Sequence, residues 1–474
     1  MFIRLRSRSM PYIIVAAASV LSLLVLVGQS LPTVRAAVTA AGHTYVVNST
    51  ADLPDGNVTD NACQALNGHC TLRAAIMQAN FTSGMDTILL PMGTYTLTIP
   101  GVDDTDQAGD LDISDDLAIV GDGPDQTIVD GNGAITGDRA FHILSTANQA
   151  SLSGITIRNG DTVYTSTSQN AGFGGGIYQD GGDLNLTDVV IEDNHASYGG
   201  GLVPSFFNRA GTTALERVTI RSNHAEQYGG GVYLIDMNGS GTSRLAVSHS
   251  TINGNTAQRG GGISFQGFGF NGVYQTTLAL TNTTVSGNLV DHDGGGIYDL
   301  GGLVQLANVT VTNNRVNLPA ADNGGLGGGG VATAAANGFV PTLDVKNSLI
   351  GNNTRRKEGV LFTFQDDCNG AITSFGNNLF QSTTNCTINV ASGDLKNVDP
   401  LLGPLQNNGG STQTQALLKG SPAIDAGNPN GCIDFNATAV NTDQRGFRRP
   451  IGSRCDIGAV EYSPYAIDLP IVYR

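Results

Sequence analysis

The sequence predicts an all-β fold, a right-handed parallel β-helix with a short N-terminal capping helix and a non-repetitive C-terminal cap. The first observation is a glycine triplet that recurs with successive starts 25, 30, 31, 34 and 34 residues apart, at Gly174, Gly199, Gly229, Gly260, Gly294 and Gly328. A period of this size indicates stacked repeats. The second is alternation of apolar and polar residues, as in Leu184-Asn-Leu186, which marks strands with one buried face. The third is a high content of Gly, Asn and Thr without apolar stripes of helical spacing, which favours a β-solenoid over a helical solenoid.

Each repeat also contains an aliphatic residue followed three positions later by asparagine. If one repeat is one coil of two or three short strands, equivalent residues stack about 4.8 Å apart. The aliphatic residues then form an interior column, and the asparagines form a hydrogen-bonded ladder in a turn. The ladder is predicted at Asn194, Asn223, Asn255, Asn288, Asn314 and Asn353. The variable repeat length predicts long loops around Phe265–Tyr274 and Asn317–Leu326, on the face that carries function.

The N-terminus reads as an export signal over residues 1–36. Basic residues precede an apolar run from Tyr12 to Val27, and Val34-Arg-Ala36 suits cleavage; the alternative is an uncleaved signal anchor. The signal holds four of the 24 basic residues and none of the 40 acidic ones. The remaining chain, with 20 basic against 40 acidic residues, is an improbable partner for nucleic acid. No second apolar stretch is long enough to span a membrane.

Six cysteines fall into three local pairs outside the repeats. They predict the disulfides Cys63–Cys70, Cys368–Cys386 and Cys432–Cys455, which would staple the ends of the stack, where neighbouring coils are missing. The alternative, a metal site, lacks the Cys and His spacing typical of zinc sites.

A helix is predicted over Thr71–Asn80, with Thr71 as its N-cap. Its apolar residues Leu72, Ile76 and Ala79 would cover the open end of the core. The stretch Cys70-Thr-Leu-Arg-Ala-Ala75, followed by Gly109-Asp-Leu-Asp-Ile113, resembles CSLREA domains of exported β-helical proteins over residues 43–160. Ala74 stands where that family has Glu, so only the Thr71 half of a capping box is present.

The C-terminal region, residues 399–462, resembles a choice-of-anchor Q domain, and residues 463–474 form a tail. The resemblance rests on Ser421-Pro-Ala-Ile-Asp-Ala-Gly427, Asp443-Gln-Arg-Gly446, Arg449-Pro450 and Asp456-Ile-Gly-Ala-Val-Glu461. Residues 161–398 resemble the repeats of polymorphic outer-membrane proteins and pectate-lyase-type β-helices. These resemblances imply export and a surface location, and they name no activity. Arg445, Arg448 and Arg449 are expected to pair with Asp443, Asp456 and Glu461 and so fasten the cap.

Three sets of side chains could carry chemistry. His195 and His224 occupy equivalent positions in neighbouring repeats, and with Glu226 and Asp293 they could bind a metal; the alternative is an exposed polar column. Tyr178, Tyr233 and Tyr298 could grip sugars; the alternative is buried packing. An acidic run could hold Ca²⁺, although its spacing fits no EF-hand and favours a solvated loop; it comprises Asp103, Asp104, Asp106, Asp110, Asp112, Asp115 and Asp116.

The catalytic sets of known β-helix enzymes are not evident. Hydrolysis of a glycoside needs two carboxylates facing one groove. A polysaccharide lyase needs a base, commonly Arg or Lys, beside Ca²⁺-binding acids, and Lys is scarce in the repeats. We therefore expect a secreted or cell-surface protein, monomeric and without a cofactor, with a structural or adhesive role toward extracellular polysaccharide or cell-surface components. The alternatives are a polysaccharide lyase or glycoside hydrolase acting in the groove, and passive surface-layer material.

Overall fold

The computed structural model describes residues 42–162, 172–207, 209–236, 242–267, 269–270, 273–274, 276–320, 327–336 and 340–464. The chain divides into two units, Met1–Thr39 and Ala40–Arg474, and the second is described here. The predicted export signal, most of the predicted tail and parts of both long loops lie outside the described residues. Within the described ranges, no helix is both long enough and apolar enough to cross a bilayer.

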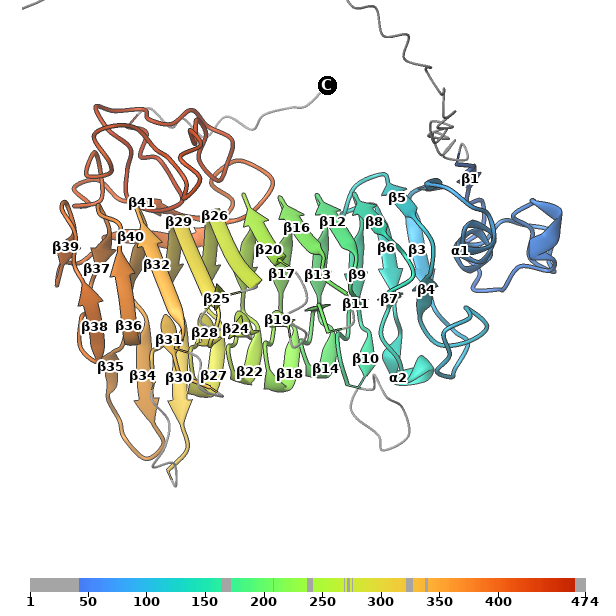
Figure 1. Ribbon diagram of the computed structural model, residues 1–474, viewed down its shortest axis with the longest axis horizontal. Helices are drawn as coiled ribbons and strands as arrows, with labels where there is room; N and C mark the ends of the chain where they lie inside the picture. Colours follow the sequence, from blue (N-terminus) through green and yellow to red (C-terminus); the bar gives the residue numbers. More distant parts are fainter. Residues whose placement is uncertain are drawn as a thin grey trace, which may run out of the picture. The chain divides into compact units, whose positions relative to one another are not determined.

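The second unit is a right-handed parallel β-helix, which confirms the predicted fold class (Figure 1). One coil consists of β11 (Ile177–Asp180), β12 (Asp183–Thr187), β13 (Val190–Glu192) and β14 (His195–Tyr198), and each strand pairs in parallel with its equivalent one coil away. The coil thus has four strands where two or three were predicted. The extra division arises because Asp188 adopts a left-handed conformation (φ 52°) and bends the chain between β12 and β13.

The strands form four columns. The first contains β4 (Leu111–Ile113), β7 (Phe141–Ile143), β11, β15 (Leu202–Ser205), β19 (Val232–Ile235), β23 (Ile263–Gln266), β28 (Ile297–Leu300), β31 (Val331–Thr333) and the start of β36 (Cys368–Ser374). The second contains β1 (Thr44–Val46), β2 (Asp86–Leu90), β5 (Leu117–Gly121), β8 (Gln149–Ser153), β12, β16 (Thr212–Glu216), β20 (Ser243–Ser248), the first halves of β26 (Thr276–Ser286) and β29 (Leu303–Thr312), β32 (Thr342–Lys346), the end of β36, and β38 (Cys386–Asn389).

The third column contains β3 (Gly93–Thr96), β6 (Thr127–Asp130), β9 (Thr156–Arg158), β13, β17 (Thr219–Arg221), β21 (Thr251–Asn253), the second halves of β26 and β29, β33 (Leu349–Gly351), β37 (Leu379–Phe380) and β39 (Leu395–Lys396). The fourth contains β10 (Asp161–Thr162), β14, β18 (His224–Tyr228), β22 (Thr256–Arg259), β27 (Leu289–Asp293), β30 (Arg315–Leu318), β34 (Thr354–Lys357) and the antiparallel β35 (Thr363–Gln365). Two small hairpins pair β24 (Gly269–Phe270) with β25 (Val273–Tyr274) and β40 (Leu402–Gln406) with β41 (Thr414–Leu417).

The interior is one continuous apolar core that runs from the N-terminal helix to the last coils. Ile191, Ile220 and Ile252 stand in direct register in the third column and are fully buried, as the repeat pattern predicts. Burying each such side chain contributes about 1.5–3 kcal/mol. Each additional coil therefore extends the core by its own buried side chains.

The glycine triplets form the bend from the fourth column to the first. The first glycine of each triplet adopts a positive φ, for example 62° at Gly199, which disfavours any other residue. A Cβ on Gly200 would lie only 2.4 Å from the carbonyl oxygen of His224. The bends therefore stack backbone on backbone, and this corner of each coil bears no side chain.

The asparagine ladder lies at the other end of the fourth-column strands, in the turn that leads from the third column to the fourth. Asn223 shows the pattern: its Nδ2 donates to Asn255 Oδ1 and to the Ile191 carbonyl oxygen, both at 3.0 Å. The same bonds repeat along all six asparagines, which are 0–1 % exposed. Asp367 ends the ladder by accepting from Asn353 Nδ2 at 3.0 Å. Burial of the Asp367 carboxyl raises its pKa to about 6.

The N-terminal cap follows the prediction. Helix α1 spans Leu72–Phe81, and the Thr71 hydroxyl accepts a hydrogen bond from the Ala74 N–H at 3.1 Å. Its apolar residues belong to the continuous core. Arg73, which sequence reasoning missed, is fully buried; it pairs with Asp52 at 2.6 Å and donates to backbone carbonyls of the loop that precedes β4. The short helices η1 (Val58–Asp60) and α2 (Gly133–Thr136) complete this end.

The three predicted disulfides are confirmed. Cys63–Cys70 precedes α1, and Cys368–Cys386 links two of the last coils. Cys432–Cys455 lies within the C-terminal region. Each bridge therefore holds an end or an irregular segment, where stacking on a neighbouring coil supplies less stability.

The C-terminal region differs from the expected end cap because it lies along the flank of the helix (Figure 1). It contacts the bends between the second and third columns in consecutive coils, where His249, Asn282, Asn308 and Asn347 have positive φ. Gln444 accepts from Thr284 Oγ1 at 2.6 Å and donates to the Ser250 carbonyl at 3.0 Å. These bends turn polar groups outward, and the C-terminal region forms hydrogen bonds with those groups.

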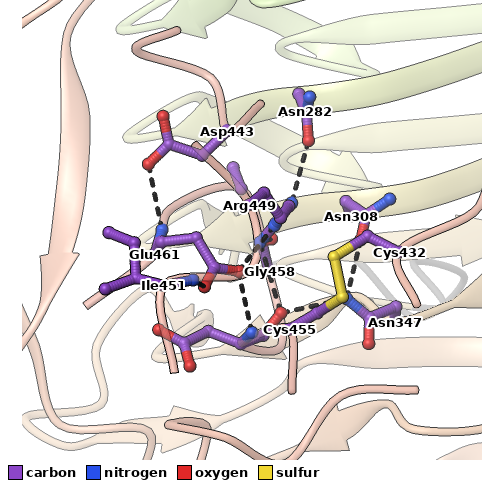
Figure 2. Close-up of polar contacts among 12 residues, drawn as sticks. Asn282, Asn308, Asn347, Cys432, Asp443, Arg449, Ile451, Cys455, Gly458 and Glu461 are labelled. Atoms are coloured by element: carbon purple, nitrogen blue, oxygen red, sulfur yellow. Dashed lines mark hydrogen bonds and ion pairs between the residues drawn. A yellow bond between two sulfur atoms is a disulfide. The ribbon is translucent and has the colours of Figure 1, made fainter. Parts of the chain in front are cut away.

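Arg449 is the centre of this attachment (Figure 2). Its guanidinium donates to Glu461 Oε1 at 2.7 Å, to Asn282 Oδ1 at 2.9 Å and to the Gly458 carbonyl at 2.6 Å. Both Arg449 and Glu461 side chains are fully buried. Arg445 pairs with Asp443 at 2.7 Å within the C-terminal region, as predicted, whereas Arg448 is exposed and the described residues show no ion pair for it.

Candidate functional site

A cluster of aromatic side chains lies on both sides of the glycine bend, outside the main core. Tyr178 and Tyr233 project from β11 and β19, Tyr198 and Tyr228 end β14 and β18, and Phe173 precedes the first triplet. We call these five residues the aromatic strip. The Phe173 and Tyr198 ring centroids lie 5.0 Å apart, and those of Tyr198 and Tyr233 lie 5.7 Å apart. Because the triplets bear no side chains, the rings from the two columns can meet across the bend.

Two members of the predicted tyrosine column, Tyr178 and Tyr233, form the floor of this cluster, whereas the third, Tyr298, lies outside it on β28. Tyr178, Tyr233 and Tyr298 are only 6 %, 3 % and 5 % exposed, which agrees with the packing alternative and corrects the prediction that these rings contact a glycan directly. Burial raises the pKa of Tyr178 and of Tyr298 to about 12, so both phenols stay protonated at neutral pH.

The accessible part of the strip was missed by sequence reasoning. Phe173, Tyr198 and Tyr228 are half-buried and stack on the buried rings. A signal was present, because Tyr198 and Tyr228 each stand directly before a glycine triplet in consecutive repeats. In this protein, the tyrosines directly before the bend are the accessible ones, and those that follow it are buried.

Polar groups border the rings. The Tyr198 hydroxyl donates to Gln227 Oε1 at 2.9 Å, and the Tyr233 hydroxyl donates to Gln266 Oε1 at 2.5 Å. Arg259 lies 5.9 Å over the Tyr228 ring and pairs with Asp293 at 3.1 Å. The surface therefore combines half-buried apolar rings with amide and hydroxyl groups, the pattern that recognises amphipathic ligands.

A buried ionic cluster continues the first column beyond Tyr178. His142 stacks on Tyr178 at 5.1 Å, and its Nδ1 lies 3.3 Å from Asp112 and 3.4 Å from Asp104. Arg139 lies 5.2 Å over the Tyr178 ring and 3.6 Å from Asp110. Asp138 also contacts Arg139 at 3.6 Å.

The burial of this cluster corrects the prediction of a solvated acidic loop. Asp106, Asp110 and Asp112 are 1–2 % exposed, whereas Asp104 is exposed and Asp115 and Asp116 are half-buried. The loop folds inward because Arg73 and Asn80 of α1 bind its carbonyl groups and the Asp106 carboxylate. A helix packed against a loop cannot be read from the acidic spacing alone.

Burial sets the electrostatics of the cluster. It raises the pKa of Asp106 and Asp110 well above the ordinary value, and neighbouring carboxylates add to the effect. Burial lowers the pKa of His142, but contacts with Asp104 and Asp112 outweigh it, so the net pKa is raised. Asp104, Asp112 and His142 offer ligand atoms within 4.8 Å of one another and could hold a cation.

The predicted metal residues separate into two places. His195, His224 and Glu226 offer ligand atoms within 4.8 Å of one another. Asp293 instead pairs with Arg259 beside the strip, which corrects its assignment to this group. Burial, with the neighbouring His195, lowers the pKa of His224 and so favours its neutral form. His195 also lines a hollow of about 400 Å³, together with Asp130, Asp161 and Asp193.

Comparison with known proteins gives one likeness. No protein-family model matches the chain, and no curated protein matches it. A solved structure described as "Crystal structure of pectate lyase Pel9A" aligns with a TM-score of 0.43 and 16 % sequence identity, covering 90 % of this chain and 98 % of that one. The resemblances to CSLREA and choice-of-anchor Q domains stay predictions from sequence.

Proposed function

We propose that this chain acts outside the cell as a rigid polysaccharide-binding protein, and that the aromatic strip is its binding site. The observation that carries the proposal is the set of half-buried rings, Phe173, Tyr198 and Tyr228, supported from below by buried rings and bordered by amide groups. Sugars present apolar C–H patches beside hydroxyl groups, and such a surface matches both. The predicted export signal, the three disulfides and the acidic composition suit an extracellular setting.

The charge around the strip favours a neutral polysaccharide. The two arginines that lie over strip rings both contact carboxylates, Arg259 with Asp293 and Arg139 with Asp110. Their positive charge is therefore offset before a ligand arrives, and the chain as a whole carries a formal charge of −16. An acidic polymer would meet repulsion that a neutral one avoids.

Rigidity is the second part of the mechanism. The four strip tyrosines lie on strands whose ends are fixed by the stacked glycine bends and the asparagine ladder. The rings lose little freedom when a ligand binds, which lowers the entropic cost of association. Repeated weak contacts along one polymer then add by avidity.

The test is binding of a neutral polysaccharide to residues 40–474 and to variants of the strip. Tyr198→Ala and Tyr228→Ala should each weaken binding about tenfold, which corresponds to about 1.4 kcal/mol for one aromatic contact. Phe362→Ala is the matched control, because Phe362 is 73 % exposed on the β34–β35 hairpin, away from the strip. Unchanged binding in both tyrosine variants would remove the strip from the account.

A polysaccharide lyase is the second candidate, favoured by the ionic cluster that adjoins Tyr178. Asp104, Asp112 and His142 could hold a cation, and Asp104 is the exposed member of the set. New unsaturated ends formed from a polysaccharide, and lost in both His142→Ala and Asp112→Asn, would establish this activity. Product formation that survives both variants would place any catalysis elsewhere.

A further inference from the structure

Four side chains of the fourth column stand in consecutive register and form a second, independent arrangement. Asp161 pairs with His195, His195 with His224, and His224 with Thr256, one from each of four successive coils. Each histidine directly follows a ladder asparagine, Asn194 or Asn223, which is buried and hydrogen-bonded on both sides. The backbone that carries the two imidazoles is therefore held in place before any ligand binds.

The outer members of this row orient the inner ones. Asp161 Oδ1 lies 3.1 Å from His195 Nδ1, and Thr256 Oγ1 lies 2.7 Å from His224 Nδ1. The opposite nitrogens both turn to Glu226: Oε1 lies 3.1 Å from His195 Nε2 and 3.8 Å from His224 Nε2. Histidines that bind metals almost always donate their second N–H to such a partner, because this fixes the tautomer and the ring orientation.

We propose that His195 Nε2, His224 Nε2 and the Glu226 carboxylate bind a divalent transition-metal ion, with Zn²⁺ as the natural occupant. Ligand atoms about 2.0–2.2 Å from a tetrahedral zinc lie about 3.3 Å apart. The Glu226 oxygen lies 3.1 and 3.8 Å from the two nitrogens, and the three residues offer ligand atoms within 4.8 Å of one another, so side-chain rotations can bring them to this spacing. Imidazole ligands select Zn²⁺ over Ca²⁺, which prefers oxygen.

An ion pair alone explains less of the geometry. A protonated His195 between Asp161 and Glu226 would account for the two 3.1 Å contacts. It would not explain why His224 turns its Nε2 to the same carboxylate while Thr256 holds its Nδ1. A shared cation explains both orientations, and it also offsets the two carboxylates. Three protein ligands leave one position of the zinc open for water or a further ligand.

The experiment is calorimetric titration of residues 40–474, purified without a histidine tag, with ZnCl₂ and in parallel with CaCl₂. We expect one zinc per chain and no binding of Ca²⁺ at this site. His195→Ala and His224→Ala should each abolish or strongly weaken zinc binding. Asp161→Asn should weaken it by about 10–100-fold, as expected for loss of a group that orients a ligand.

His69→Ala is the matched control, because His69 is exposed in the N-terminal cap, outside this row. Thermal unfolding in EDTA should show that each variant remains folded. Zinc affinity that is equal in the wild type, His195→Ala and His224→Ala would overturn the proposal, as would absence of saturable binding. The result is separate from polysaccharide binding, which is measured with EDTA present.

Discussion

Replacing Asn288 by alanine tests the ladder at its centre. The Asn288 side chain is fully buried and makes four hydrogen bonds. Its Nδ2 donates to the Ile252 carbonyl at 3.0 Å and to Asn314 Oδ1 at 2.8 Å, and its Oδ1 accepts from the backbone N–H and from Nδ2 of Asn255, both at 3.0 Å. At about 1 kcal/mol for each bond, the expected loss in unfolding free energy is about 4 kcal/mol.

The assay combines urea unfolding with amide hydrogen exchange. The Asn255 N–H should exchange much faster in Asn288→Ala, because it loses its acceptor, whereas amides several coils away should change little. Asn389→Ala is the matched control, since Asn389 is exposed at the end of β38, and it should cost less than about 0.5 kcal/mol. A loss below about 1 kcal/mol in Asn288→Ala, with unchanged exchange at Asn255, would refute the reasoning.

Three further predictions concern the C-terminal region on the flank and the N-terminal cap. Arg449→Met should destabilise the C-terminal region by about 3–5 kcal/mol, because it leaves the Glu461 carboxylate buried without its partner. Limited proteolysis should then release this region first. Equal protease resistance of the variant and the wild type would contradict the prediction. Burial, with Glu461 nearby, raises the pKa of Asp456 to about 7, so the folded state holds this proton more tightly than the unfolded chain does. The free energy of unfolding should therefore fall by up to about 4 kcal/mol as pH rises from about 4 to 7. Asp456→Asn should flatten the dependence of Tm on pH. Thr71→Ala should lower the unfolding free energy by about 1–2 kcal/mol through loss of the helix cap, measured against Thr71→Ser, which keeps the acceptor.

The repeat pattern was sufficient to predict the β-helix. In a stack of coils, equivalent residues of successive repeats have the same surroundings, so one repeat indicates the structure of the others. The buried column of Ile191, Ile220 and Ile252, the asparagine ladder and the helix cap at Thr71 all follow from local spacing. Local pairing of cysteines was sufficient for the disulfides, because each bridge closes a short loop.

The rest depends on contacts between segments far apart in sequence. The flank position of the C-terminal region rests on Arg449 reaching Asn282, across 167 residues, and no periodic signal announces that contact. The acidic loop is buried because α1 packs against it. Tyr198 meets Tyr233, a ring of another column, only because the glycine bend brings two columns together. The side-chain contacts at these three places form only when the coils are assembled.

The measurement that tests the central claim most directly is incubation of residues 40–474 with a panel of neutral and acidic polysaccharides, with and without Ca²⁺. Both retained protein and newly formed reducing or unsaturated ends are followed. The account predicts saturable retention on at least one neutral polysaccharide, independent of Ca²⁺, with no product. Absence of retention on every neutral polymer, or steady release of product, would contradict it.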